Sequence, residues 1–130
     1  MDRTDTTNIL SFVSKFFEEN VAVINFEMIN PNDPFGQTMV MNLEDRGCQL
    51  LSINDIPNEQ AQEERMSESG FTYSYCENML RVHNCRLDDK ERERIEKIEI
   101  FDELEEWDLL QTHYCICIGS KFQDNSEFSF

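Results

Sequence analysis

Apolar side chains recur at two spacings along this 130-residue chain, and each spacing predicts one kind of element. Over Thr7–Glu19 they follow the helical repeat of about 3.6 residues, with Thr7 or Asn8 as a suitable cap. The β-branched run Val21–Phe26 comes next and is typical of a buried strand. Near the end, a charged and half-apolar segment from Arg94 changes into the uncharged run His113–Gly119, so the change from helix to strand is repeated.

The uncharged closing run His113–Gly119 is typical of a strand covered by helices on both faces. Strands of one-sided antiparallel sheets show a polar face instead. Helices that lead into such buried strands predict an α/β layered fold. A chain of 130 residues forms one domain and buries about two-thirds of the surface of its unfolded state.

The segment after Val21–Phe26 predicts a loop that leads into a second helix. Asp33 is a good N-cap, and Pro34 suits the first helical position, where its missing N–H is not needed. The helix is expected to end at Arg46, with Gly47 in the left-handed position that follows. The loop therefore lies at the carboxyl end of a strand, where open α/β sheets bind ligands. This loop is either a ligand-binding site or an ordinary connection between the strand and the helix.

Weaker signals follow in the middle of the chain. A polar helix is expected within residues 54–69, with Pro57 near its start and Gly70 near its end. Phe71–Cys76 alternates large and small residues, which suits a strand near a sheet edge. The pattern over Met79–Asn84 is ambiguous.

Two capping-box patterns precede the closing strand. Asp88 with Glu91 predicts a helix through Ile98, and Asp102 with Glu105 predicts a second, short helix. Residues 120–130 are polar and are expected to form a frayed tail.

The charge of the chain narrows the range of partners. Asp and Glu outnumber Lys and Arg by 27 to 11, for a net charge of −16. Binding to phosphates needs clustered Lys and Arg, so neither nucleic acid nor an anionic membrane is expected as a partner. No apolar run approaches the roughly 20 residues of a membrane span. The start lacks a signal-peptide pattern and the five cysteines are an odd number, so we expect reduced thiols in the cytosol or the nucleus. Of these two locations, we predict the cytoplasm.

Few residues are candidates for chemistry. His113, Cys115 and Cys117 would line one face of a strand, and because the chain has no Cys-x-x-Cys pair, we interpret them as core and expect no metal. Nothing near His83 and Cys85 would orient a nucleophile pair. The four glycines are too scattered for a phosphate or nucleotide loop. The residues alone therefore predict no catalytic group.

Two segments resemble the leucine carboxyl methyltransferase family. The first contains Ile24–Asn30, Phe35–Gln37, Met39 and Asn42–Leu43, and the second is Glu99–Cys117 with its Asp102–Glu103 and His113–Cys115 elements. Their order and spacing agree with the family across residues 7–119. The resemblance implies a Rossmann-like, seven-stranded, S-adenosylmethionine-dependent methyltransferase sheet. It also implies methylation of the C-terminal leucine carboxylate of the protein phosphatase 2A catalytic subunit, while a related branch acts on wybutosine in transfer RNA.

The resemblance covers only the C-terminal half of the family domain. Residues 1–119 would supply strands five to seven with flanking helices, and the residues that bind S-adenosylmethionine would have no counterpart here. Glu27, Asn30 and Gln37 would face the substrate, and no residue of this chain would be catalytic. A terminal carboxylate has a pKa near 3.5 and is already an anion, so its methylation needs no conspicuous base.

The chain departs from the family pattern at Phe26, Met28, Pro34 and Met41, each of which replaces a polar or charged residue. A second hypothesis follows from these departures: a non-catalytic binding module or truncated relative that keeps only the substrate-facing half. An unpaired edge on the strand at Val21–Phe26 would also favour self-association or marginal stability.

Overall fold

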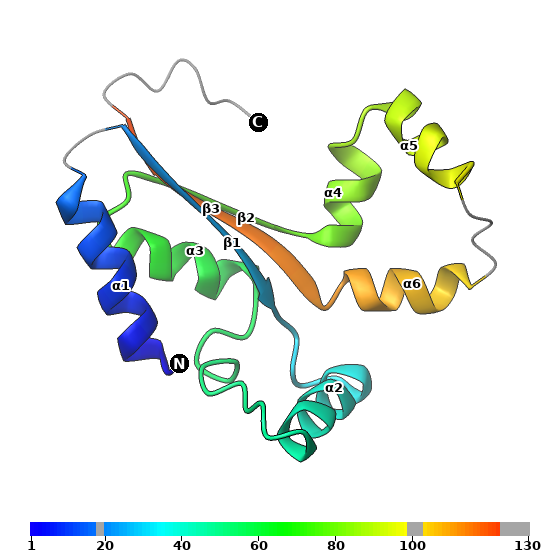
Figure 1. Ribbon diagram of the computed structural model, residues 1–130, viewed down its shortest axis with the longest axis horizontal. Coiled ribbons are helices and arrows are strands. Elements are labelled where there is room, and N and C mark those ends of the chain that lie inside the picture. Colours follow the sequence, from blue (N-terminus) through cyan, green and yellow to red (C-terminus); the bar gives the residue numbers. More distant parts are fainter. Residues whose placement is uncertain (18–19, 99–102, 123–130) are drawn as a thin grey trace.

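The computed structural model describes residues 1–17, 20–98 and 103–122, which contain one three-stranded sheet (Figure 1). The strands are β1 (Val21–Met28), β2 (Tyr73–Asn78) and β3 (Tyr114–Lys121), in the spatial order β1-β3-β2. β3 is antiparallel to both neighbours. The α/β class is confirmed, and so is the position of β2 at a sheet edge.

Helices α1 (Arg3–Phe16) and α3 (Glu59–Glu68) lie on one side of this sheet (Figure 1). Alternation along β3 places Cys115 and Cys117 on the side that faces α3, and both are fully buried. Gly119 continues this row, since an added Cβ there would lie 2.8 Å from the sulfur of Met66. The main core is therefore a single layer between the sheet and these two helices. Its buried members are Leu10, Val21, Ile29, Met66, Phe71, Cys76, Cys115 and Cys117.

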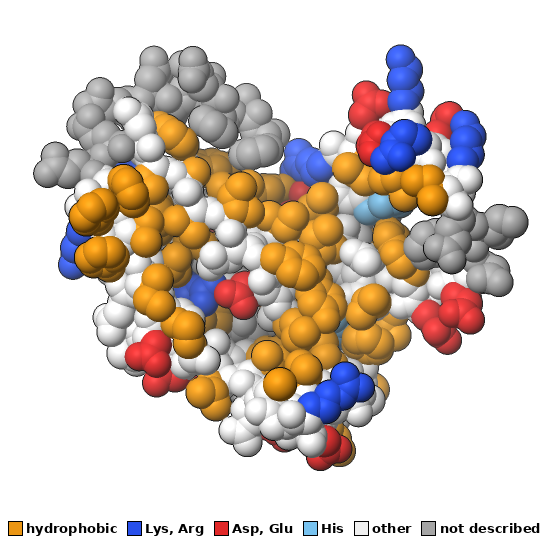
Figure 2. All heavy atoms as spheres, in the orientation of Figure 1, with side chains coloured by type: hydrophobic (Ala, Val, Ile, Leu, Met, Phe, Trp, Pro, Cys, Tyr) orange, Lys and Arg blue, Asp and Glu red, His pale blue; other side chains and the backbone are white. Residues whose placement is uncertain are grey.

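The opposite side of β1 is open to solvent. Ile24 and Phe26 are 69% and 61% exposed, and β3 alternates between buried and half-buried residues. The predictions that Val21–Phe26 is a buried strand and that helices cover the closing strand on both faces are therefore wrong. Among the described residues, helices cover only one face of β1, so every second apolar side chain points into solvent. Figure 2 shows hydrophobic side chains in a band across the middle of the molecule.

Helix α1 begins earlier than its apolar pattern predicts. The carboxylate of Asp2 accepts a hydrogen bond from the backbone N–H of Asp5 at 2.8 Å, so Asp2 is the cap and the expected caps Thr7 and Asn8 lie inside the helix. The buried side of α1 carries Leu10 and Ser14.

Helix α2 (Pro34–Asp45) begins and ends with the expected residues. Asp33 accepts a hydrogen bond from Gly36 N–H at 2.7 Å, and Gly47 has φ +74°. The N–H of Gly47 donates to Glu44 O and that of Cys48 to Leu43 O, which together form a Schellman motif. The helix is one residue shorter than predicted, because Arg46 is its C-cap.

An arm of three helices connects β2 to β3: α4 (Met79–Cys85), α5 (Asp89–Glu96) and α6 (Leu104–Gln111) (Figure 1). The ambiguous segment after β2 is helix α4, because Asn78 accepts a hydrogen bond from Arg81 N–H and caps it. Asp88 caps α5 by accepting a hydrogen bond from Lys90 N–H, so the predicted start of this helix is confirmed. The capping-box bond that was expected from Glu91 N–H is replaced by this one. The expected cap Asp102 lies outside the described residues.

Strand β3 continues through Lys121, two residues beyond its expected end at Gly119, so Ser120 and Lys121 belong to the strand rather than to a frayed tail. Ser120 is buried and its carbonyl accepts the N–H of Thr72. Residues 123–130 lie outside the described residues. In the part of the chain that is described, no helix combines the length and apolar character needed to cross a membrane.

Candidate functional site

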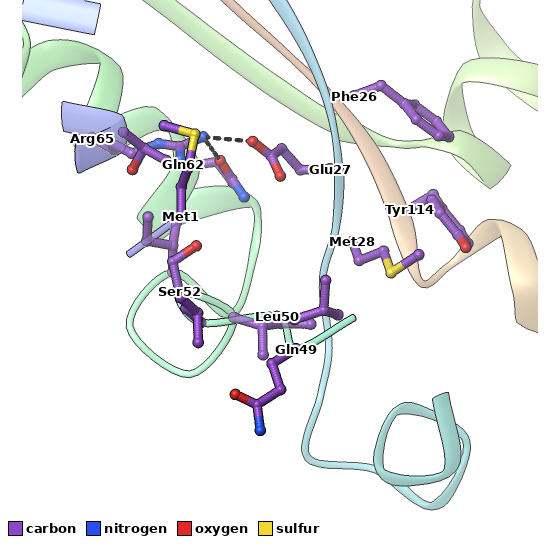
Figure 3. Close-up of a pocket in the computed structure, with 14 residues that line it drawn as sticks. Met1, Phe26, Glu27, Met28, Gln49, Leu50, Ser52, Gln62, Arg65 and Tyr114 are labelled. Atoms are coloured by element: carbon purple, nitrogen blue, oxygen red, sulfur yellow. Dashed lines mark hydrogen bonds and ion pairs between the residues drawn. The ribbon is translucent and has the colours of Figure 1, made fainter. Parts of the chain in front are cut away.

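A cavity of about 450 Å³ lies beside the carboxyl half of β1 (Figure 3). Its walls come from β1, from α3 and from the loop between α2 and α3. Most of the lining is apolar, and its polar centre is formed by Glu27, Gln62 and Arg65. The apolar residues at its border are Met1, Phe26, Met28, Leu50, Leu51, Ile53, Ile56 and Tyr114.

The polar centre is held by the guanidinium of Arg65, whose side chain is only 2% exposed. Its Nη2 lies 3.3 Å from Glu27 Oε1 and donates to Gln62 Oε1 at 2.5 Å (Figure 3). The Glu27 side chain is 38% exposed, so the carboxylate sits between the buried cation and the open cavity. Arg65 Nε is buried and has no hydrogen-bond partner among the described residues.

Local structure explains why these groups meet. Asn58 caps α3 by accepting the N–H of Ala61, and Gln62 and Arg65 are then three residues apart on one helix face. Glu27 lies on the covered face of β1, which α3 packs against. A buried guanidinium is costly unless it is paired, so removal of the Glu27 carboxylate would leave a charge without compensation.

The three predicted substrate residues are not all brought to this cavity. Glu27 lines it, whereas Asn30 and Gln37 are outside its lining. Asn30 Nδ2 donates to Thr112 O at 2.9 Å, and Gln37 Nε2 donates to Asn32 O at 3.0 Å. Both amides therefore hold the loop between β1 and α2 in its conformation.

One contact at this loop was missed by reasoning from the sequence. His113 is 1% exposed, and its Nε2 lies 2.9 and 3.0 Å from the two carboxylate oxygens of Asp33. The N–H of Gly36, followed by the His113 ring, lowers the pKa of Asp33 below its usual range. His113 is buried as expected, but it is bonded across the fold, and only the capping role of Asp33 was visible in the sequence.

A row of thiols lies in the core rather than in a ligand site. Cys76 is opposite Cys117 in the sheet, and Cys115 is on the same face. The neighbouring thiols of Cys115 and Cys117, together with burial, raise the pKa of Cys76. All five cysteines are free, and the described residues contain no cluster of three or more His, Cys, Asp or Glu side chains suited to a metal ion.

A second cavity of about 320 Å³ lies where β2 meets α4. Glu77 is buried there, with Arg81 Nε at 3.1 Å and Arg86 Nε at 2.9 Å. Burial raises the pKa of Glu77, but hydrogen bonds from Arg86 and Tyr75 outweigh it and lower the pKa overall. Burial, with Glu77 nearby, raises the pKa of Tyr75. This cluster attaches the helical arm to the sheet.

The architecture is that of a small α/β unit with an antiparallel sheet, compatible with part of a methyltransferase domain. No protein-family model matches the chain. Among individual proteins, the leucine carboxyl methyltransferase 1 homolog of Arabidopsis thaliana is 40% identical over 116 residues, which is 89% of this chain and 35% of that protein. Leucine carboxyl methyltransferase 1 of Bos taurus is 35% identical over 93% of this chain and 36% of its own length.

A third relative comes from a different branch. Human tRNA wybutosine-synthesizing protein 4 is 34% identical over 102 residues, which is 78% of this chain and 15% of that protein. The agreement with several methyltransferases over most of the chain shows that it belongs to the leucine carboxyl methyltransferase family. The chain spans about a third of the length of the curated methyltransferases from Arabidopsis and Bos taurus.

Proposed function

We propose that the chain is the substrate-facing, C-terminal part of an S-adenosylmethionine-dependent protein carboxyl methyltransferase. The proposed substrate is the C-terminal leucine of the protein phosphatase 2A catalytic subunit, and the proposed location is the cytoplasm. The observation that carries the proposal is the 40% identity to a leucine carboxyl methyltransferase homolog over 89% of this chain. The full seven-stranded sheet would then need strands beyond the three described here.

In this proposal the residues of this chain do not hold S-adenosylmethionine. A glycine-rich cofactor loop needs glycines whose backbone faces open space. A Cβ at Gly36 would lie 2.0 Å from Asn30 O, and one at Gly119 would lie 2.8 Å from the sulfur of Met66, so both glycines are packed against protein. Gly47 ends a helix, and Gly70 lies against Ser14. We therefore assign no cofactor-binding or catalytic role to any residue here.

Glu27, Asn30 and Gln37 are the proposed substrate-side residues. The Glu27 carboxylate is neutralised by Arg65, so it need not repel a substrate carboxylate, and it can accept hydrogen bonds from a peptide backbone. The apolar wall made by Leu50, Ile53 and Ile56 suits a leucine side chain. In this proposal Asn30 and Gln37 shape the loop that borders the cavity.

The first test is retention of the phosphatase catalytic subunit by the immobilised chain. We expect retention of the form that ends in leucine and little retention of a form without that leucine. Glu27→Gln should weaken binding about tenfold or more, because a charge-assisted hydrogen bond is worth about 1.5–3 kcal/mol. Glu44→Gln changes an exposed carboxylate on α2 outside the cavity and is the matched control. Equal retention of both phosphatase forms would contradict the proposal.

Calorimetry with S-adenosylmethionine is the second test. The chain alone should show no binding heat, since the cofactor residues are proposed to lie elsewhere in the family domain. Tight binding would show that the cofactor site has been misplaced.

The alternative function is a non-catalytic binding module of the same family. Phe26 and Met28 stand next to Glu27 on β1 where the family has polar residues, and the loss of these polar groups favours binding without chemistry. Such a module would compete with a complete family enzyme for the phosphatase and lower its methylation rate. The transfer-RNA branch is a further alternative, although the net charge of −16 opposes it.

A further inference from the structure

The turn at Thr112 and His113 is attached to the loop after β1 by three contacts. Ile29 N–H donates to His113 O at 2.9 Å, Asn30 Nδ2 donates to Thr112 O at 2.9 Å, and the His113 ring pairs with Asp33. We call the five residues that make these contacts the clasp: Ile29, Asn30, Asp33, Thr112 and His113. It joins the loop that leads into α2 to the point where the helical arm returns to the sheet.

The ring of His113 lies between two oxygen acceptors. Nε2 faces the Asp33 carboxylate, and Nδ1 lies 2.8 Å from the carbonyl oxygen of Leu109. A carbonyl and a carboxylate accept hydrogen bonds and donate none, and a neutral imidazole has only one N–H. The hydroxyl of Thr112 is 3.3 Å from Nδ1, but it is already 2.7 Å from Leu109 O and donates there. Both contacts are satisfied only when both ring nitrogens carry protons.

We propose that His113 is a positioning residue that, as a buried imidazolium paired with Asp33, fixes the loop carrying Asn30 and Gln37. Its functional meaning rests on the proposed function, because those two residues are assigned to the substrate side there. The His113 side chain is 1% exposed and that of Asp33 is 46% exposed, so removal of the carboxylate would leave a buried charge without compensation.

The loop has little freedom to move without the clasp breaking. Asn30 adopts φ +58°, and its carbonyl oxygen occupies the space where a Cβ at position 36 would lie. The ring of Phe35 is 4.5 Å from that of His113, so the first turn of α2 packs on the same group.

Asp33 is the only ionised group that bonds to the imidazole among the described residues. Within the described residues, the other acidic and basic groups on the elements around His113 make no hydrogen bond or ion pair with its ring. They are Glu27 on β1, Glu44, Asp45 and Arg46 around the end of α2, Glu105, Glu106 and Asp108 on α6, and Tyr114 and Lys121 on β3.

Nitrogen-15 NMR of the two histidine rings tests the proposal directly. In the full chain near neutral pH, the signals of His113 should be those of a ring with two protonated nitrogens. Asp33→Asn is the key variant, because Asn caps a helix about as well as Asp but carries no charge. It should abolish the imidazolium signature and shift the backbone amides of Asn30 and Gln37.

Asp33→Ser is the second variant, since Ser also caps helices but is too short to reach His113. It should reproduce both effects of Asp33→Asn. A singly protonated His113 in the unmodified chain would overturn the proposal, as would an imidazolium that persists in Asp33→Asn. Unchanged loop amides in both variants would overturn the positioning role. None of these readouts needs phosphatase or cofactor, so failure of the proposed function leaves this test intact.

Discussion

Replacement of Gly36 by alanine should have two opposing effects on the stability of the fold. Gly36 lies in the first turn of α2, and helix propensity alone predicts that alanine stabilises by about 1 kcal/mol there. The added methyl group, however, would lie 2.0 Å from Asn30 O and 2.8 Å from Pro31 Cα. Both contacts are to backbone, so neither can be relieved by rotation of a side chain.

Relief of this overlap requires movement of the loop after β1. The loop is held by Asn30 N–H to Pro57 O at 2.7 Å and by Asn30 Nδ2 to Thr112 O at 2.9 Å. Loss of these bonds costs about 0.5–1.5 kcal/mol each, and overpacking adds about 1–3 kcal/mol. After the propensity gain is deducted, we expect Gly36→Ala to lower the free energy of unfolding by about 1–5 kcal/mol.

Urea denaturation followed by circular dichroism measures this change, as a lower midpoint with an unchanged slope. Gly47→Ala is the matched control, because Gly47 has φ +74° and no atom within 4 Å of its missing Cβ. Its cost is backbone strain alone, about 1–2 kcal/mol. Gly36→Ala should also shift the amide of Thr112, which Gly47→Ala should leave in place. A Gly36→Ala chain as stable as the unmodified one would refute the reasoning.

Three further outcomes are expected. Glu77 has a lowered pKa in the folded state, so its contribution to stability is present above the unfolded pKa and is lost as the pH falls through the folded one. The Glu77→Gln variant should therefore be less stable than the unmodified chain near neutral pH, but it should lose less stability on acidification. Urea midpoints over the acid range measure this, and parallel pH curves for the two chains would contradict it. Iodoacetamide should modify the exposed Cys48 and Cys85 quickly and the three buried cysteines only on unfolding, as followed by mass spectrometry. The open face and edge of β1 should cause self-association on size-exclusion chromatography, and Ile24→Lys should reduce it; a sharp monomer peak for the unmodified chain would count against this.

Short-range patterns in the sequence predicted the helix ends because the hydrogen bonds that end a helix join residues close together along the chain. Asp33 and Gly47 mark the ends of α2 through hydrogen bonds to residues within one or two turns. The same signals failed at α1, where Asp2 caps the helix a turn before the apolar repeat begins. An apolar repeat reports which residues can be buried, whereas the cap reports where the helix starts.

Contacts across the fold left little trace in the sequence. The pairing of His113 with Asp33 depends on the antiparallel placement of β3 beside β1, and no short-range pattern encodes it. Burial of Arg65 beside Glu27 was missed because a charged residue on a polar helix looks solvated. The exposure of Ile24 was also missed, since hydrophobicity cannot tell which of two faces a neighbouring element covers. Of the site, only Glu27 was both predicted and found at the cavity.

The central position of β3 has a consequence for how the chain folds. β1 and β2 come first in the sequence, yet in the described sheet each pairs only with β3, which is the last strand. On a ribosome, neither pair of the described sheet can close until β3 has emerged, so this sheet forms after most of the described residues have been synthesised. Until then Val21–Met28 lacks its partner from the described sheet, and closure of such long loops makes folding slow.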